Sequence, residues 1–370
     1  MSKINYDYLI IGAGLSGITL AERLSQNSKL NILIIDKRDH IGGNIYDYYN
    51  SDNVLIHKYG PHIFHTSNEK VFEYLSSFTD WTLYKHKVLA SVNNKLLPIP
   101  INRDTINGFF NINLNSESEV EEFLETKKDK SILEIKNSRD VIVSKYGEEL
   151  YDNFIKNYTK KQWDLYPEEL DKSVLQRIPI RYDSNPYYFN DKYQGLPKEG
   201  YTCMVRKMIN RKNIKIVLDT NHKEFIKTVN FDKLIVTSPI DEFFDYSFGK
   251  LRYRAVKFIF ETYSQNSYQK NSVINFPNDK KYTRITEFKK LTLQKTPKTT
   301  ICKEIPTWDG EKTYPVPSEI DNQILSQYQE HAKKLDNVYF LGRLGQYKYI
   351  NMDQAVNNAL ELYETLKNIH

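Results

Sequence analysis

Residues 6–26 read YDYLIIGAGLSGITLAERLSQ, and residues 30–38 read LNILIIDKR. The first stretch runs from apolar residues through a glycine turn into an amphipathic helix, and the second supplies another buried strand. This order predicts a β–α–β unit. Within it Gly12 permits the tight turn, Gly14 lets the backbone approach a pyrophosphate, and Gly17 allows the helix to pack closely on the strand.

The same unit predicts where a dinucleotide would bind. Asp36 ends the second strand, where a ribose hydroxyl would lie, and the N-terminus of the helix favours a pyrophosphate. A glycine motif that lies between a strand and a helix and is followed by an acid about 20 residues on is a more specific signal than glycines alone. The alternative is that these glycines form a turn that binds nothing. The residues expected around the pyrophosphate and the ribose are Gly12, Ala13, Gly14, Leu15, Ser16, Gly17, Asp36, Lys37 and Arg38.

Residues 36–44, DKRDHIGGN, favour FAD over NAD as the dinucleotide. Their glycine pair resembles the extended fingerprint of FAD-dependent proteins, in which the chain passes close to the flavin side of the cofactor. Residues 338–362 repeat the order strand, glycine, helix, so we expect a discontinuous Rossmann-like domain rather than an ordinary terminal α/β pair. No second GxGxxG occurs, which argues against a separate nicotinamide domain. These motifs add Gly42, Gly43, Asn44, Gly342, Arg343 and Met352 to the expected cofactor residues.

The composition excludes several other classes of protein. The chain of 370 residues carries 52 basic and 47 acidic side chains, and the net charge of +5 is too slight to argue for nucleic acid, although it suits an anionic small ligand. Cys203 and Cys302 have no spacing typical of a disulfide framework or a zinc site, so we expect no metal. No apolar run approaches membrane-spanning length, and the start lacks a secretory leader. We therefore expect a cytoplasmic globular protein that binds neither nucleic acid nor membrane.

The rest of the chain divides into two kinds of sequence. Residues 102–176 are charged, with helical spacing and Ser or Pro at helix starts, and predict an inserted helical domain. Residues 86–100, 253–264 and 282–292 are rich in β-favouring residues and predict one antiparallel sheet. The fold class expected is α/β, and the expected division is an FAD-binding domain of 1–80, 196–245 and 325–370, a helical subdomain of 102–176, and a sheet domain of 81–101, 177–195 and 246–324.

Several motifs outside the glycine turns resemble one family. From Tyr6 to Met352 the chain is similar to the bacterial UDP-galactopyranose mutases, in the motifs YGPHIFHT, YTKKQW, RIPIR, NDKYQG, YTRITEF and GRLGQYKYINMD. The resemblance implies a homodimeric FAD isomerase that interconverts UDP-galactopyranose and UDP-galactofuranose for cell-surface polysaccharide. It also implies that N5 of reduced FAD attacks the sugar's anomeric carbon and displaces UDP, so no acid or base is needed near YTKKQW.

The family resemblance also assigns residues to the substrate. Trp163 and Tyr158 resemble the aromatic pair that packs the uracil, a stack of about 1–3 kcal/mol by analogy with other nucleobases. Arg177 and Arg284 resemble the arginines that bind the diphosphate, since a fixed charge with forked donors suits phosphate. His65 is expected beside the flavin ring, and His62, Ile63 and Tyr349 are added to the cofactor residues. The catalytic candidates are Arg177, Arg284 and His65, and the substrate-binding candidates are Tyr158, Thr159, Trp163, Arg177, Tyr188, Asn275, Arg284, Tyr314, Tyr349, Asn351 and His62.

Two further expectations concern the substrate. Many family members have an aspartate where this chain has Asn351, so one charge is lost and UDP-N-acetylgalactosamine becomes an alternative substrate. Pro167 interrupts the chain after Trp163, and residues 167–177, PEELDKSVLQR, predict a short charged helix with few apolar anchors. We interpret that helix as a mobile lid that brings Arg177 to the diphosphate.

Each assignment has a plainer alternative. Trp163 is otherwise a half-buried helix anchor, the arginines are surface ion-pair partners, and the tyrosines are core residues. His62 and His65 would then only support the Gly60 turn. At the level of function the alternatives are a flavin amine oxidase or dehydrogenase, which needs no pair of phosphate-binding arginines, and a flavin-free binding protein resembling the Rab-GDP dissociation inhibitors.

Overall fold

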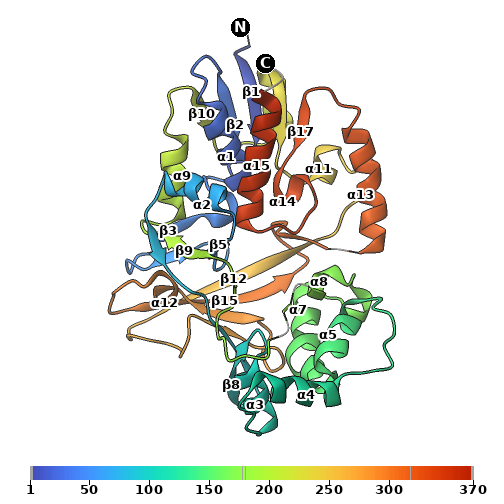
Figure 1. Cartoon of the computed structure of the whole chain (residues 1–370). Helices are drawn as coiled ribbons and strands as arrows, with labels where there is room; N and C mark the ends of the chain where they lie inside the picture. Colours follow the sequence, from blue (N-terminus) through green and yellow to red (C-terminus); the bar gives the residue numbers. More distant parts are fainter. Residues whose placement is uncertain (1–2, 177, 180, 317, 368–370) are drawn as a thin grey trace.

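The computed structural model of the chain describes residues 3–176, 178–179, 181–316 and 318–367, and Figure 1 shows its arrangement. One end of the molecule, which carries both chain termini, holds a parallel sheet with helices against it. The other end holds a second, larger sheet with a group of helices beside it (Figure 1). The predicted combination of a Rossmann-like domain, a helical insertion and a largely antiparallel sheet is confirmed, whereas the boundaries drawn between the domains stay a prediction.

The first sheet consists of parallel strands in the order β10–β2–β1–β11–β17. Its strands are nearly continuous apolar runs because both faces are covered. Alternate side chains of β1 pack with α1 and α15 on one face and with the α10–α11 region on the other. The bounds are β1 (Asn5–Ile11), β2 (Ile32–Ile35), β10 (Ile214–Val217), β11 (Asn230–Val236), β17 (Val338–Phe340), α1 (Leu15–Leu24), α9 (Tyr201–Ile209), α10 (His222–Phe225), η4 (Ile226–Thr228), α11 (Ile240–Phe243), α13 (Glu319–Ala332), α14 (Gly342–Gly345) and α15 (Met352–Lys367).

The second sheet has the order β16–β12–β15–β14–β13–β7–β8. Its pairs are antiparallel with one exception, since β13 runs parallel to β7. The predicted antiparallel sheet is therefore confirmed, with this one parallel pair as a departure from it. A tight hairpin forces neighbours to be antiparallel, but a long connection separates these two strands and leaves either direction open. The bounds are β7 (Val88–Val92), β8 (Lys95–Ile99), β12 (Tyr253–Tyr263), β13 (Val273–Asn275), β14 (Arg284–Glu287), β15 (Thr299–Thr307), β16 (Tyr314–Pro315) and α12 (Phe288–Thr292).

Short elements join the two sheets. A three-stranded sheet of order β5–β9–β6 and a hairpin of β3 and β4 lie around residues 57–65, the segment that carries His57, His62 and His65. Apolar side chains from these strands, α2, α9 and the second sheet share one core, so the histidine segment is held from several sides. The bounds are η1 (Gly43–Ile45), β3 (Asp47–Tyr49), β4 (Leu55–His57), β5 (Phe64–Thr66), α2 (Glu69–Ser76), β6 (Trp81–Leu83) and β9 (Tyr193–Pro197).

Of the predicted Ser or Pro helix starts, Ser116 is the N-cap of α4 and Pro167 begins η3, whereas asparagines that were not predicted cap α3 and α5. Asn102, Ser116 and Asn137 each accept a backbone N–H of the following helix, as N-cap residues do. A π-helical stretch, η2, leads directly into α7, which carries the YTKKQW motif. The bounds are α3 (Arg103–Phe110), α4 (Glu117–Lys127), α5 (Ser138–Tyr146), α6 (Glu148–Leu150), η2 (Tyr151–Lys156), α7 (Asn157–Trp163), η3 (Pro167–Glu169) and α8 (Ser173–Gln176).

The segment interpreted as a lid has more apolar anchors than the sequence suggested. Leu170, Val174 and Leu175 are buried in the core of the helical region, and the Ser138 hydroxyl donates to the Asp171 carbonyl oxygen at 2.6 Å. The expectation of one helix with few anchors is wrong, because the segment forms two short helices, η3 and α8, and all three of these apolar side chains enter one core. Arg177, the residue that the lid was expected to carry, lies outside the described residues.

Candidate active site

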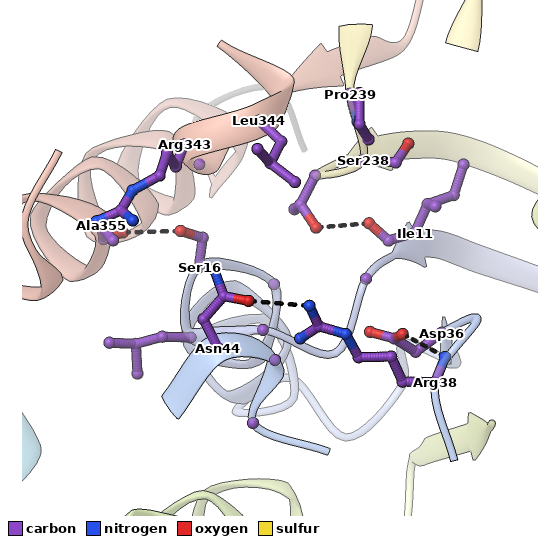
Figure 2. Close-up of a pocket in the computed structure, with 18 of the residues that line it drawn as sticks. Ile11, Ser16, Asp36, Arg38, Asn44, Ser238, Pro239, Arg343, Leu344 and Ala355 are labelled. Carbon is purple, nitrogen blue, oxygen red and sulfur yellow. Dashed lines mark hydrogen bonds between the residues drawn. The ribbon is translucent and has the colours of Figure 1, made fainter. Parts of the chain in front are cut away.

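A cavity opens at the carboxyl ends of the parallel strands, between the N-termini of α1 and α15 (Figure 2). It contains about 1240 Å³ of space between atoms, part of it open to solvent. Ala13, Ile63 and Tyr349 are the predicted cofactor residues that the described wall does not include. The predicted residues that do line it are Gly12, Gly14, Leu15, Ser16, Gly17, Asp36, Lys37, Arg38, Gly42, Gly43, Asn44, His62, Gly342, Arg343 and Met352.

The glycines fit a dinucleotide in a way that larger residues would not. Gly12 has φ +109°, and a Cβ there would stand 2.0 Å from Thr237 Oγ1. A Cβ on Gly14 would meet only the Gly43 Cα, at 4.0 Å, so it would project into the cavity and fill the space that a pyrophosphate needs. Gly14 is also the N-cap of α1 and provides no side-chain cap, so the positive end of this helix faces the cavity.

Asp36 connects the glycine turn after β1 with the turn after β2, and both turns contribute to the cavity wall. Its Oδ2 accepts the Ala13 backbone N–H at 2.7 Å, and its Oδ1 accepts the Arg38 backbone N–H at 2.9 Å. Ala13 therefore shapes the site through Asp36 rather than by lining it. The Arg38 guanidinium donates to Asn44 Oδ1 at 2.9 Å across the same wall (Figure 2). A carboxylate oxygen has room for more than one donor, so Asp36 retains the capacity to accept a ribose hydroxyl.

Part of the wall was not found from the sequence. Thr237 to Pro239 follow β11, and the rule that ligands bind at the carboxyl ends of parallel strands was the available signal for them. Glu311 and Lys312 come from the loop between β15 and β16, for which no sequence signal existed. The cavity residues missed are Ile11, Ile35, Ile45, Thr220, His222, Thr237, Ser238, Pro239, Glu242, Glu311, Lys312, Leu344, Ile350 and Ala355.

A row of polar residues crosses the second sheet near its centre. Asn275, Arg284 and Glu304 stand opposite one another on β13, β14 and β15. Arg284 Nε lies 2.8 Å from Glu304 Oε1, whose side chain is only 4% exposed. Burial opposes the charge on Arg284, but Glu304 and Tyr158 outweigh it and hold the pKa of the guanidinium well above its ordinary value. The side-chain oxygen of Asn275 is buried and has no partner among the described residues, so it is available to a ligand donor.

An aromatic cluster lies between this row and the cavity. The Tyr314 and Tyr349 rings stack with their centroids 5.6 Å apart, and Trp163 meets them edge-on at 6.4 and 6.2 Å. Arg343, a cavity residue, lies 5.3 Å from the Tyr314 ring and 5.2 Å from the Tyr349 ring. Trp163 is only 5% exposed, so its ring has no open face for a base in this conformation. The Trp163 ring thus supports the Tyr314 and Tyr349 rings, and stacking of Trp163 on uracil stays a prediction.

The other predicted substrate residues surround Arg284. Burial raises the pKa of Tyr158, and the nearby Arg284 charge works against that rise. Burial likewise raises the pKa of Tyr314, and Tyr349 adds to the effect. Tyr188 is exposed, whereas Thr159 is buried in α7. The Tyr158 and Tyr314 hydroxyls therefore keep their protons and are able to donate hydrogen bonds to phosphate oxygens.

The two histidines of the motif GPHIFH, His62 and His65, lie in different surroundings. His62 lines the cavity, its Nδ1 lies 2.9 Å from the Gly60 carbonyl oxygen, and burial lowers its pKa to about 3, so it is neutral. His65 is outside the described cavity wall. Its Nδ1 lies 2.9 Å from Asp191 Oδ2, and its ring stacks on Phe189 at 3.6 Å. Asp191 was missed from the sequence, although it lies within the quoted motif NDKYQG.

Asn351 lies on the cavity wall close to α15 rather than deep in the aromatic cluster. Its backbone N–H donates to Gln354 Oε1 at 2.9 Å, and the residue is exposed. In the part of the chain that the structure describes, no group of three or more His, Cys, Asp or Glu side chains could hold a metal ion. Within the same residues every helix is too short or too polar to span a bilayer.

Fold and site together define an α/β enzyme with a dinucleotide cavity beside a cationic and aromatic second site. A family model described as NAD(P)-binding Rossmann-like domain matches residues 10–78, and one described as UDP-galactopyranose mutase matches residues 153–349. The chain belongs to the UDP-galactopyranose mutase family, a family of isomerases.

Named relatives agree with this family. The chain is 38% identical to a probable UDP-galactopyranose mutase of Klebsiella pneumoniae, over 96% of this chain and 94% of the relative. It is 34% identical to a dTDP-fucopyranose mutase of Escherichia coli, over 95% of this chain and 96% of the relative. A crystal structure of reduced UDP-galactopyranose mutase matches with a TM-score of 0.79 at 15% identity, covering 100% of this chain and 95% of that one. A putrescine oxidase shares the fold with a TM-score of 0.61 at 9% identity, covering 99% and 100%.

Proposed function

We propose that this enzyme interconverts UDP-galactopyranose and UDP-galactofuranose, with reduced FAD in the cavity. One observation carries the proposal: Arg343 lines the dinucleotide cavity and also contacts the Tyr314 and Tyr349 rings of the second site. A cofactor in the cavity and a nucleotide sugar in the second site would therefore be neighbours. An amine oxidase has no use for a half-buried arginine, Arg284, with tyrosine hydroxyls near it, whereas a diphosphate is well matched to them.

The residues of the cavity fit FAD along its length. The backbone at Gly14 and the N-terminus of α1 would hold the pyrophosphate, and Asp36 would accept from the ribose. Gly42 and Gly43 would let the chain approach the flavin side. When bound in its reduced form, FAD would supply the nucleophile for the anomeric carbon, and the reaction would return it unchanged.

The chain's own residues have to hold the nucleotide while the sugar rearranges. Arg284 is preformed for this because Glu304 fixes its guanidinium and its remaining N–H groups can donate to phosphate. The hydroxyls of Tyr158, Tyr188, Tyr314 and Tyr349 would complete the phosphate site. Arg177, outside the described residues, stays the proposed second arginine, carried by the proposed lid.

Two observations favour a second substrate. Asn351 is neutral, and a relative that is 34% identical is named for a different nucleotide sugar, dTDP-fucopyranose. The alternative is therefore the same ring contraction on another sugar, of which UDP-N-acetylgalactosamine is the candidate that the sequence suggested. The homodimer, the cytoplasmic location and the polysaccharide that would use the product also stay proposals.

The substrate is tested with dithionite-reduced protein and a panel of furanose nucleotides under anaerobic conditions. We expect chromatography to show UDP-galactofuranose converted to UDP-galactopyranose, with UDP-N-acetylgalactofuranose and dTDP-fucofuranose as the comparison substrates. Preferential conversion of either comparison substrate would transfer the assignment to that sugar. Oxygen consumption with putrescine, and no conversion of any nucleotide sugar, would favour the oxidase alternative instead.

A further inference from the structure

The carboxyl end of α7 is held by an arginine from the second sheet. Arg254 on β12 donates from Nε to the Gln162 carbonyl oxygen at 3.0 Å and from Nη2 to the Lys161 carbonyl oxygen at 3.3 Å. The last carbonyls of a helix lack intrahelical partners, and a cation there also opposes the negative end of the helix dipole. Arg254 is only 3% exposed, so its charge is committed to this contact.

A tryptophan completes the contact from a loop of the same sheet. The Trp308 indole N–H donates to Asp164 Oδ2 at 2.8 Å, and the Arg254 guanidinium lies 4.4 Å from the Trp308 ring centroid. Asp164 directly follows Trp163 and has a left-handed backbone, with φ 58°, that ends α7. Arg254, Trp308 and Asp164, here called the α7 clamp, thus fix the residue next to Trp163.

The loop that carries Trp308 continues to the dinucleotide cavity. Glu311 pairs with Arg38, and both side chains line the cavity. Lys312 also lines it, and its Nζ lies 3.3 Å from both carboxylate oxygens of the buried Asp241. The first residue of this short loop therefore contacts the end of α7, whereas residues three and four positions later contact the cofactor side.

We propose that the α7 clamp positions Trp163 and its two tyrosines, and that loop 308–312 couples this position to the cofactor cavity. The proposal rests on the proposed function, because it takes UDP as the ligand of the second site and FAD as the ligand of the cavity. A cofactor that fixes Arg38 and Lys312 fixes the loop, and the loop fixes the end of α7. Coupling of two binding sites is reciprocal, so UDP has to tighten the binding of FAD by the same factor.

The positioning role is tested by UDP titration of the oxidised holoenzyme in a calorimeter. Trp308→Phe keeps the ring over Arg254 and loses one hydrogen bond, so we expect UDP to bind about threefold to tenfold more weakly. Trp308→Ala loses the ring as well and has the larger effect. The control is Trp81→Phe, because Trp81 also donates its indole N–H, to Ser76 Oγ at 2.8 Å, but lies away from both sites.

A double variant separates positioning from a general loss of stability. If Trp308 acts through Trp163, then Trp308→Ala weakens UDP binding in the wild-type background and has little further effect in Trp163→Ala. Equal effects in both backgrounds would overturn the positioning role. A wild-type protein that binds no UDP would contradict the proposed function itself, together with this inference.

The coupling is tested by the temperature at which flavin fluorescence reports release of FAD. We expect UDP to raise this temperature in the wild type and in Trp81→Phe. The rise should shrink in Glu311→Gln, which removes the negative charge that faces Arg38, and in Trp308→Ala. An undiminished rise in both loop variants would overturn the coupling while leaving the UDP-binding site intact.

Discussion

Arg284 and Glu304 form a nearly buried ion pair across two neighbouring strands, with Nε and Oε1 2.8 Å apart. The pair is placed where the proposed diphosphate would bind, so Glu304 holds the guanidinium in the absence of substrate and competes with phosphate in its presence. Asn275, on the other side of Arg284 in the same row, has a side-chain oxygen without a described partner. The row is therefore a preformed site in which the charges of Arg284 and Glu304 balance each other before any ligand binds.

Glu304→Gln should lower the Tm of the free protein and enlarge the rise in Tm that UDP causes. Removing one partner of a buried pair costs about 3–5 kcal/mol, because the other charge is left without compensation, and a bound diphosphate would restore that compensation. The matched control is Glu261→Gln, since Glu261 pairs with Lys303 at 2.5 Å in the same sheet but is more exposed. A smaller UDP-induced rise in Glu304→Gln than in the wild type would contradict this account of Arg284.

Asp36→Ala should yield protein with little bound flavin. The substitution removes the acceptor for the ribose and also the hydrogen bonds from the Ala13 and Arg38 backbone N–H groups, through which Asp36 joins the glycine turn to the turn after β2. The flavin absorbance per protein measures the loss. Asp7→Ala is the control, because Asp7 also accepts a backbone N–H, from Asn31 at 2.6 Å, in the same domain but away from the cavity wall. Normal flavin content in Asp36→Ala would show that the cavity binds the cofactor differently.

His57 should make the fold sensitive to acid. Burial lowers its pKa to about 3, so the folded protein keeps it neutral, while the unfolded chain binds a proton below its ordinary value of 6.5. Stability is thus lost as the pH falls from 6.5 towards 3, at about 1.4 kcal/mol per pH unit. His57→Asn cannot titrate, so the difference in unfolding free energy between wild type and variant should narrow by about 2 kcal/mol from pH 7 to pH 5. A difference that does not change with pH would show that His57 has the same pKa in the folded and the unfolded chain, and would contradict this prediction.

Arg177→Ala should lower kcat strongly and change UDP affinity little, whereas Arg284→Ala should impair both. The reason is that Arg284 is fixed by Glu304 before binding, while the proposed lid brings Arg177 to the diphosphate only after binding. Steady-state kinetics and UDP titration provide the two readouts. Protection of the bonds between Trp163 and Arg177 from proteolysis by UDP is the independent check. An intact kcat in Arg177→Ala, or no protection, would exclude the lid.

The cofactor end of the molecule was largely predictable from the sequence. Its determinants are local, since the φ of Gly12 and the space beside Gly14 act within one turn and leave a recognisable pattern. Residues 338–362 were expected to join the same sheet because they repeat the order strand, glycine, helix, and their glycine lines the same cavity. Residues after β10 and β11 were missed because their only signal is their place at the carboxyl ends of parallel strands, and that place depends on the strand order of the whole sheet.

The second site was predictable only as a set of motifs. Which residue balances Arg284 depends on the register of β14 and β15, and register is set by the whole sheet rather than by the residues around Arg284. The same limit applies to Trp308, whose partner Asp164 is brought to it by tertiary packing of the helical region. The parallel pair of β13 and β7 and the burial of Leu170 are likewise products of long-range contacts.

The central claim, isomerisation without net redox change, is tested most directly by counting product against flavin. The reduced holoenzyme is given excess UDP-galactofuranose without oxygen, and both UDP-galactopyranose and the flavin spectrum are followed. We predict many molecules of product per flavin, a flavin that is still reduced at the end, and nearly no turnover by the oxidised enzyme. One product or fewer per flavin with concurrent flavin oxidation, or equal turnover by the oxidised enzyme, would contradict the account.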